Sequence, residues 1–206
     1  MLLQACNAPK QPAISSSSET TSDTIRASIG TLLTNPYINM DASPLDISYF
    51  PEDYTSQKMN STAAASPMMR IIYGRPFKKG RVIFSDVDNA ICQYGKPWRL
   101  GANEATEIEF FYPVKIAGKE FQPGRYIMYA IPEKEFWTIV FNSNVHSWGL
   151  HIDPSKDVFR TRVPVEVQQP AIENFTMVFT GSAPKPSILM AWDDVKVELP
   201  IEIRKL

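Results

Sequence analysis

Apolar and polar residues alternate with a period of two along most of the chain from about Ser43 onward. In the clearest case, five apolar side chains between Val195 and Ile203 alternate with charged residues or proline. Successive side chains of an extended strand point to opposite faces, so such a segment buries one face and exposes the other. We therefore predict strands here and in the other segments with this pattern, which are 126–131, 137–141, 159–167 and 175–179.

Residues typical of turns separate these segments. Between Val114 and Ile131, the pairs Ala117-Gly118 and Pro123-Gly124 predict two bends and consecutive hairpin-like strands. Prolines inside the alternating segments, such as Pro164, predict strand edges or ends. Roughly nine to eleven short strands result, and no long helical pattern interrupts them. The predicted fold class is all-β, an antiparallel β-sandwich that is jelly-roll-like or related, over residues 43–206, with a disordered N-terminal leader.

The N-terminus resembles a bacterial lipobox, because a leucine lies three positions before Cys6 and Ala5 directly precedes it. This interpretation makes residues 1–6 the remnant of a lipoprotein signal and Cys6 the site of lipid attachment. The charged segment and the apolar segment of about 7–15 residues that a secretory signal needs are missing. Either the true start lies upstream, or the chain was trimmed, or the match is accidental and Cys6 is an ordinary terminal residue.

Residues 7–42 are predicted to form a flexible tether. Eleven Ser or Thr residues and no aromatic residue lie between Lys10 and Asn35, so the segment buries too little apolar surface to offset the entropy of ordering it. Apolar residues at helical spacing predict a short helix over 23–34 that is stable only when docked. Nowhere do 18 apolar residues follow one another. We therefore expect membrane attachment only through a lipid anchor.

Composition excludes several classes of function. With 21 basic and 22 acidic side chains the net charge is −1, so no basic field is available to bind nucleic acid. The chain has no Gly-rich phosphate loop and no nucleophile-elbow pattern, and no cofactor is predicted. His146 and His151 lie near Asp153, but in an extended segment their separation places the rings on opposite faces, so no metal site is predicted.

Two other features invite a chemical interpretation. Cys92 has no histidine nearby in the sequence, and a buried small apolar residue is favoured over a nucleophile, although a base could approach it in space. The pair Asp193-Asp194 favours a turn or bulge over two paired catalytic carboxylates.

One stretch is distinctive beyond its strand pattern: residues 94–110, YGKPWRLGANEATEIEF. It resembles the central motif of the bacterial domain-of-unknown-function family 2911. The resemblance extends to further blocks in order, at 72–76, 79–81, 123–126, 130–132, 137–139, 148–149 and 191–192. It implies a secreted or envelope-associated β-rich domain and brings no established activity.

The chain departs from that family in two loops. Residues 85–93 stand where the family usually has a shorter link that contains glycine, and residues 150–153 lack the aromatic residue that commonly precedes the aspartate. Ligand contacts made by these two loops would be particular to this member.

The candidate binding site is centred on Trp98, Arg99, Asn103 and Glu104. An aromatic ring, a guanidinium, an amide and a carboxylate together are typical of the wall of a sugar- or peptide-binding cleft. The alternative is structural: Arg99 and Glu104 form an ion pair that locks a loop, and Trp98 fills the core. Tyr94, at the start of the same motif, and Trp148, in the 148–149 block, complete the aromatic candidates.

A basic cluster, made up of Arg70, Arg75, Lys78, Lys79 and Arg81, offers a second candidate. Arginines such as Arg75 and Arg81 suit bidentate contact with a carboxylate or phosphate. The alternative is a solubilising hairpin edge that lysines protect against strand pairing.

Together these features predict a lipoprotein of the cell envelope, periplasmic or attached to the outer membrane. Its expected role is a non-catalytic binding or assembly module for a small molecule, glycan or protein. The alternative is a hydrolase-like enzyme acting on envelope glycan or peptide, with Glu104 as acid or base and Arg99 orienting the substrate. No catalytic constellation is complete in the sequence, and fold alone does not imply function.

Overall fold

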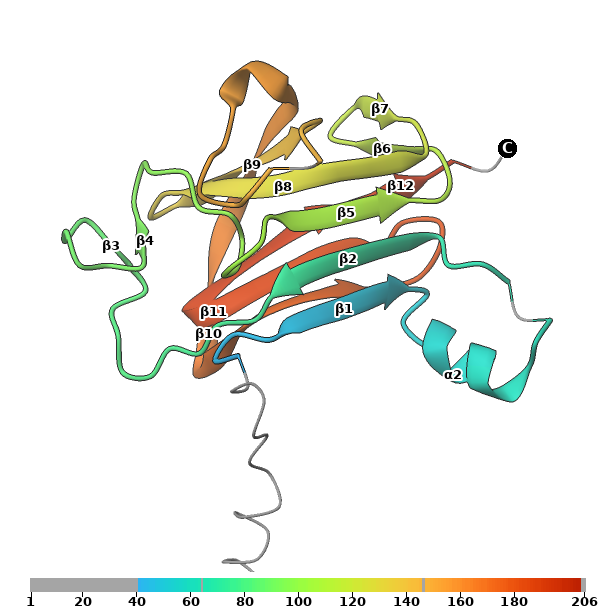
Figure 1. Ribbon diagram of the computed structural model, residues 1–206, viewed down its shortest axis with the longest axis horizontal. Coiled ribbons are helices and arrows are strands. Elements are labelled where there is room, and N and C mark those ends of the chain that lie inside the picture. Colours follow the sequence, from blue (N-terminus) through green and yellow to red (C-terminus); the bar gives the residue numbers. More distant parts are fainter. Residues whose placement is uncertain (1–40, 64, 146, 205–206) are drawn as a thin grey trace, which may run out of the picture. The chain divides into compact units, whose positions relative to one another are not determined.

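The computed structural model describes residues 41–63, 65–145 and 147–204 (Figure 1). The predicted lipobox, the predicted helix over 23–34 and the tether up to residue 40 lie outside the described residues. Within them the all-β prediction is confirmed, because strands make up most of the regular structure and the helices are α2 (Tyr54–Asn60) and the short 3₁₀ helix η1 (Pro154–Lys156). Neither helix is long and apolar enough to cross a membrane, a statement limited to the described part of the chain.

The main sheet has seven strands in the order β1-β2-β5-β8-β9-β10-β11, and every neighbouring pair is antiparallel (Figure 1). Their bounds are β1 (Leu45–Phe50), β2 (Met69–Gly74), β5 (Thr106–Phe110), β8 (Gly124–Pro132), β9 (Phe136–Asn142), β10 (Asp157–Thr180) and β11 (Ser187–Pro200).

Two small sheets accompany the main one. One has the order β12-β6-β7, with β12 (Glu202–Ile203), β6 (Val114–Ile116) and β7 (Lys119–Phe121). The other pairs β3 (Phe84–Ser85) with β4 (Cys92–Gln93) in parallel, an exception to the antiparallel pattern. The predicted bend at Ala117-Gly118 joins β6 to β7 as a hairpin. After the bend at Pro123-Gly124, however, β8 pairs with β5 and β9 of the main sheet.

The main sheet curls, because β10 is long enough to pair with β9 along its first part and with β11 along its later part. Its first part, Asp157–Pro164, pairs with β9, and its later part pairs with β11. The later part also reaches the other end of the sheet, where the Phe179 amide donates to Ser48 Oγ of β1 at 3.4 Å. A sandwich of two separate sheets is thus not confirmed, and the core lies within the curl of one sheet.

Of the two outcomes predicted for prolines, a strand edge or a strand end, β10 does not end at its prolines. Pro164 is the last residue that pairs with β9, and Pro170 falls in the break of register between the Val167–Val195 and Ile172–Asp193 pairs with β11. Since proline lacks an amide hydrogen, it is tolerated where a ladder is interrupted or changes partner. The strand therefore continues through both residues.

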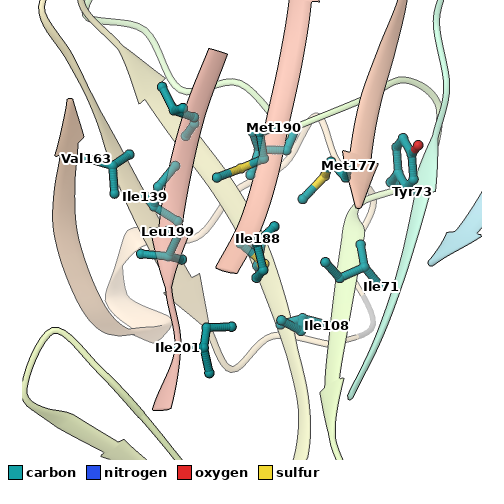
Figure 2. Packing of buried hydrophobic residues seen from close by; sticks show 14 of the residues in the cluster. Ile71, Tyr73, Ile108, Ile139, Val163, Met177, Ile188, Met190, Leu199 and Ile201 are labelled. Atoms are coloured by element: carbon teal, nitrogen blue, oxygen red, sulfur yellow. The ribbon is translucent and has the colours of Figure 1, made fainter. Parts of the chain in front are cut away.

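The core combines aliphatic side chains from both ends of the curled sheet with a cluster of aromatic rings. Figure 2 shows Ile71 of β2, Ile139 of β9, Met177 of β10 and Met190 of β11 among the packed core side chains, and all four are fully buried. Trp98 lies in the aromatic cluster, whose other members are Phe84, Trp137, Phe175 and Trp192. Rings packed at edge-to-face and stacked angles add to the energy of area burial.

Candidate functional site

Trp98 is held by both its backbone and its ring. Its amide donates to the Ala130 carbonyl of β8 at 2.7 Å, and the Ala130 amide donates back to the Trp98 carbonyl at 2.8 Å. The ring is 7% exposed and stacks on Trp192 at 5.9 Å between centroids. Its indole Nε1 donates to the Gly101 carbonyl at 3.2 Å. The residue thus fills the core and fixes the start of the loop that follows.

Close backbone approaches tie this loop to two other motif blocks. A Cβ placed on Gly74 would lie 2.0 Å from the Ala102 carbonyl oxygen, and one on Gly101 would lie 2.6 Å from the Gly74 carbonyl oxygen. A Cβ on Gly149 would lie 2.4 Å from Arg99 Cδ and 3.2 Å from the Ala105 amide nitrogen. Only glycine lets the chains approach so closely, so three blocks of the family resemblance interlock around residues 98–106.

Arg99 follows Trp98 and lies at a concave surface. A cavity of about 380 Å³ is lined by Ile91, Pro97, Trp98, Arg99, Gly149, Leu150 and Ile152, and it is called the Arg99 cavity below. Arg99 Nη1 donates to the Asn103 carbonyl at 2.7 Å. Partial burial lowers the pKa of the Arg99 guanidinium, against the opposing effect of the nearby Glu104 charge. The cation is therefore partly desolvated beside an open hollow.

Asn103 and Glu104 do not line the Arg99 cavity. Asn103 has φ +62, which Asn tolerates better than most residues, and its Nδ2 donates to Asp41 Oδ2 at 2.6 Å and to the Ser43 carbonyl at 3.2 Å. This amide therefore fastens the segment that precedes β1. Glu104 is exposed, and its negative charge acts on the nearby Arg99 guanidinium.

Tyr94 and Trp148 lie apart from the cavity lining. Tyr94 borders a separate hollow of about 320 Å³ with Asp86, Lys134 and neighbouring residues, and the Lys134 ammonium lies 5.7 Å from the centroid of its ring. Trp148 precedes Gly149 and is 49% exposed. The cavity thus gathers two of the eight residues predicted to bind a ligand, Trp98 and Arg99.

Arg75 and Arg81, the candidates from the basic cluster, make structural contacts. Arg75 Nη1 forms an ion pair with Asp46 Oδ2 at 2.9 Å, and that carboxylate also accepts from the Tyr73 hydroxyl. Arg81 donates from Nε to the Lys78 carbonyl at 3.0 Å and from Nη2 to the Phe77 carbonyl. The other charges of the cluster include Arg70, paired with Glu109, and Lys78, paired with Asp193.

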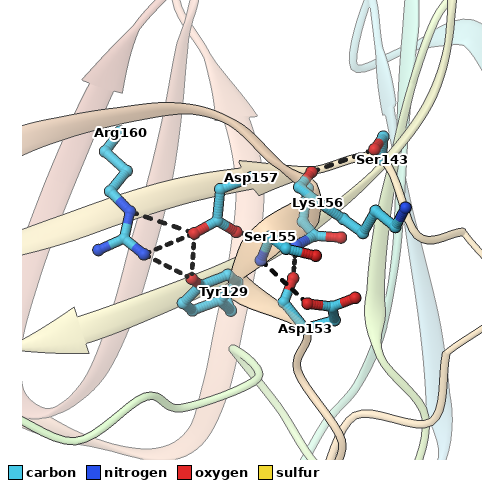
Figure 3. Close-up of polar contacts among 8 residues, drawn as sticks. Tyr129, Ser143, Asp153, Ser155, Lys156, Asp157 and Arg160 are labelled. Carbon is cyan, nitrogen blue, oxygen red and sulfur yellow. Dashed lines mark hydrogen bonds and ion pairs between the residues drawn. The ribbon is translucent and has the colours of Figure 1, made fainter.

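A polar cluster links the end of β9 to the start of β10 (Figure 3), and the sequence analysis did not predict it. The Asp157 carboxylate accepts from the Tyr129 hydroxyl at 2.8 Å, from Asn142 Nδ2 at 2.8 Å and from Arg160 Nη2 at 2.5 Å. Asn142 Nδ2 also donates to the Asp153 carbonyl at 2.8 Å. We call Tyr129, Asn142, Asp157 and Arg160 the Asp157 clasp.

The clasp supports one wall of the Arg99 cavity. Gly149, Leu150 and Ile152 belong to the connection whose two ends Asn142 and Asp157 join. Tyr129 alternates with the core residues Met128 and Ala130, yet it is 1% exposed on the opposite face of β8. Burial and the Asp157 hydrogen bond raise the pKa of the Tyr129 hydroxyl, which keeps it protonated as a donor.

The remaining candidates have structural surroundings. Cys92 is buried, and desolvation raises the pKa of its thiol well above the usual value. Asp193 has φ +55 and lies at the irregular register of β10 and β11, which agrees with the predicted bulge. His151 is exposed, and His146 lies outside the described residues. In the described ranges, no group of three or more His, Cys, Asp or Glu side chains is placed to hold a metal ion.

Three lining residues that lie outside the motif blocks were not among the predicted site residues. Ile91 comes from the 85–93 loop, and Leu150 and Ile152 come from the 150–153 loop. These are the two loops in which the chain departs from the family pattern. That departure was the signal in the sequence, but only the fold places the two loops on one cavity.

Comparison with known proteins identifies a family. A family model described as "Protein of unknown function (DUF2911)" matches residues 52–201, most of the chain, and the chain therefore belongs to this family. Searches of the curated proteins and of the solved structures gave no match.

Proposed function

We propose that this DUF2911 protein is a non-catalytic binding module of the cell envelope, attached through a lipid on Cys6, that holds a small anionic ligand in the Arg99 cavity. The observation that supports the proposal most directly is the environment of the Arg99 guanidinium. Its guanidinium is partly desolvated beside a hollow of about 380 Å³. That volume is at the lower end of the range for small-molecule sites, about 300–1,000 Å³.

The hydrogen bonding of Arg99 leaves donors for a ligand. Nη1 donates to the Asn103 carbonyl, and within the described residues no other hydrogen bond from this side chain is found. A guanidinium offers five donors in a planar fork that matches a carboxylate. A buried or half-buried charge is costly unless it is paired, so an anion that restores the pairing gains affinity.

The alternative function, a hydrolase with Glu104 as acid or base, has less support. Glu104 is exposed and is not among the residues that line the cavity. A general acid or base must lie within hydrogen-bond reach of the group it protonates or deprotonates. The Arg99 cavity does not present the Glu104 carboxylate to a ligand, because Glu104 is not one of its lining residues.

Isothermal titration calorimetry with hexanoate and with the uncharged hexanamide tests the proposal. We expect heat of binding with hexanoate and none with hexanamide, and we expect Arg99→Ala to abolish the hexanoate signal. Arg99→Lys keeps the charge but loses the fork and should bind weakly. Glu104→Gln removes the negative charge that acts on Arg99 and should bind hexanoate at least as tightly as the wild type. Equal binding of hexanoate and hexanamide, or unchanged binding by Arg99→Ala, would refute the proposal.

Attachment through Cys6 has a separate test. In cells that express a full-length precursor, Cys6→Ser should move the protein from the membrane fraction to the soluble periplasmic fraction. Continued membrane attachment of this variant would rule out acylation at Cys6 without bearing on the cavity.

A further inference from the structure

We infer that the ligand of the Arg99 cavity is an aliphatic carboxylate, and that Ile91, Leu150 and Ile152 select it by the length of its apolar chain. This inference rests on the proposed function, because it takes Arg99 as the partner of the carboxylate. It adds the chemical class of the rest of the ligand.

Arg99 is the one charged side chain of the lining, and backbone groups add further polar surface to the cavity. Beside Arg99, the side chains that line the cavity are those of Ile91, Pro97, Trp98, Leu150 and Ile152. None of the aliphatic ones can donate or accept a hydrogen bond, and the indole Nε1 of Trp98 is already bonded to the Gly101 carbonyl at 3.2 Å. A ligand here therefore meets one cationic side chain, several apolar side chains and the polar backbone groups between them.

The side chains of this lining offer a sugar or peptide fewer directed polar groups than the sequence motif predicted. Sugars and peptides carry many polar groups, and a site that buries them must supply several directed hydrogen bonds. The two residues expected to supply them, Asn103 and Glu104, lie outside the lining. Burying a hydroxyl against Ile91 or Leu150 without a partner would cost affinity.

The apolar walls expose surface that a hydrocarbon chain would cover. Ile91 is 39% exposed and Leu150 is 67% exposed. Burial of each methylene group of a ligand is worth a factor of about four in affinity at roughly 0.8 kcal/mol. A water molecule takes up about 30 Å³ of liquid, so a hollow of about 380 Å³ accepts roughly a dozen heavy atoms. Chains near octanoate or decanoate would fill it.

Titration of the intact chain with butanoate, hexanoate, octanoate and decanoate tests the inference. We expect affinity to rise by about fourfold per methylene and to level off near decanoate. Leu150→Ala and Ile91→Ala should lower octanoate affinity by roughly four- to tenfold and change butanoate affinity much less. Val167→Ala is the matched control, because Val167 is an aliphatic residue, 79% exposed, on β10 and outside the lining.

The outcomes separate the inference from the proposal beneath it. Binding that depends on Arg99 but not on chain length, or that is insensitive to Leu150→Ala and Ile91→Ala, overturns the inference and leaves an anion site. Binding that grows with chain length but survives Arg99→Ala is nonspecific and overturns the inference. No binding of any of the four carboxylates overturns both.

Discussion

Replacement of Asp157 by alanine should destabilise the protein because it leaves hydrogen-bond donors without their acceptor. The Tyr129 hydroxyl, on a side chain 1% exposed, donates to Asp157 and has no other acceptor in the described structure. A buried donor left unsatisfied costs about 1–3 kcal/mol. Asn142 Nδ2 keeps its bond to the Asp153 carbonyl, and Arg160 is half-exposed, so its ion pair adds at most about 1 kcal/mol. We expect a total loss of about 2–4 kcal/mol for Asp157→Ala.

Urea unfolding followed by circular dichroism measures this loss through the midpoint and the slope of the transition. Asp153→Ala is the matched control, because this residue is partly exposed and its carboxylate accepts from Ser155 at the start of η1. The control should cost about 1 kcal/mol, the value of an N-cap.

A double-mutant cycle gives the decisive comparison. Tyr129→Phe removes the hydroxyl that Asp157→Ala leaves unsatisfied, so the double variant should be more stable than the sum of the two single losses predicts, by about 1–2 kcal/mol. Additive losses, or a cost of Asp157→Ala no greater than that of Asp153→Ala, would show that the clasp does not hold the connection in the way the distances indicate.

Three further predictions concern the fold around the site. Gly74→Ala should lower the free energy of unfolding in urea by at least about 2 kcal/mol, since its Cβ would lie 2.0 Å from the Ala102 carbonyl oxygen. An unchanged free energy of unfolding would show that the loop around Ala102 moves to make room for the methyl group. Burial raises the pKa of Tyr73 from 10.0 to about 12. The folded state therefore keeps the hydroxyl proton to a higher pH than the unfolded state does. The free energy of unfolding should fall as the pH rises from about 10 to 12. Tyr73→Phe should lose less stability over that interval in thermal melts, and an unchanged pH dependence would contradict the assignment. In a Cys6→Ser background, the raised pKa and burial of the Cys92 thiol predict labelling by a thiol reagent only after unfolding; rapid labelling of the native protein would count against a buried thiol.

The family match covers residues 52–201, and the structure explains why its motif blocks belong together. Gly74, Gly101 and Gly149 come from three separate blocks, and each sits where a Cβ would collide with another part of the chain. Much of the motif therefore encodes the interlocking of loops. Arg99 is the motif residue whose side chain combines this packing with access to a cavity.

The sequence by itself determined the strand character of the chain and which residues face the core in the later part of β10 and in β11, although Val167 of the predicted 159–167 segment is exposed. Period-two alternation is a local property, and burial of alternate side chains follows wherever a strand covers a core. Met177 and Phe179 of β10 and Val197 and Leu199 of β11 are buried as their alternation predicts. The bulge at Asp193 followed from local turn chemistry for the same reason.

Only the tertiary structure decided how the strands join and where the cavity lies. The curl depends on β10 exchanging β9 for β11 at Pro164, and the choice between partners is made by contacts far apart in the sequence. Ile91 and Leu150 meet across the Arg99 cavity because the loops that carry them are placed by the β3–β4 pairing and by the Asp157 clasp. Local sequence patterns do not predict such contacts. They determine the backbone conformation of each loop, and that conformation is the same wherever the loop is placed in the fold.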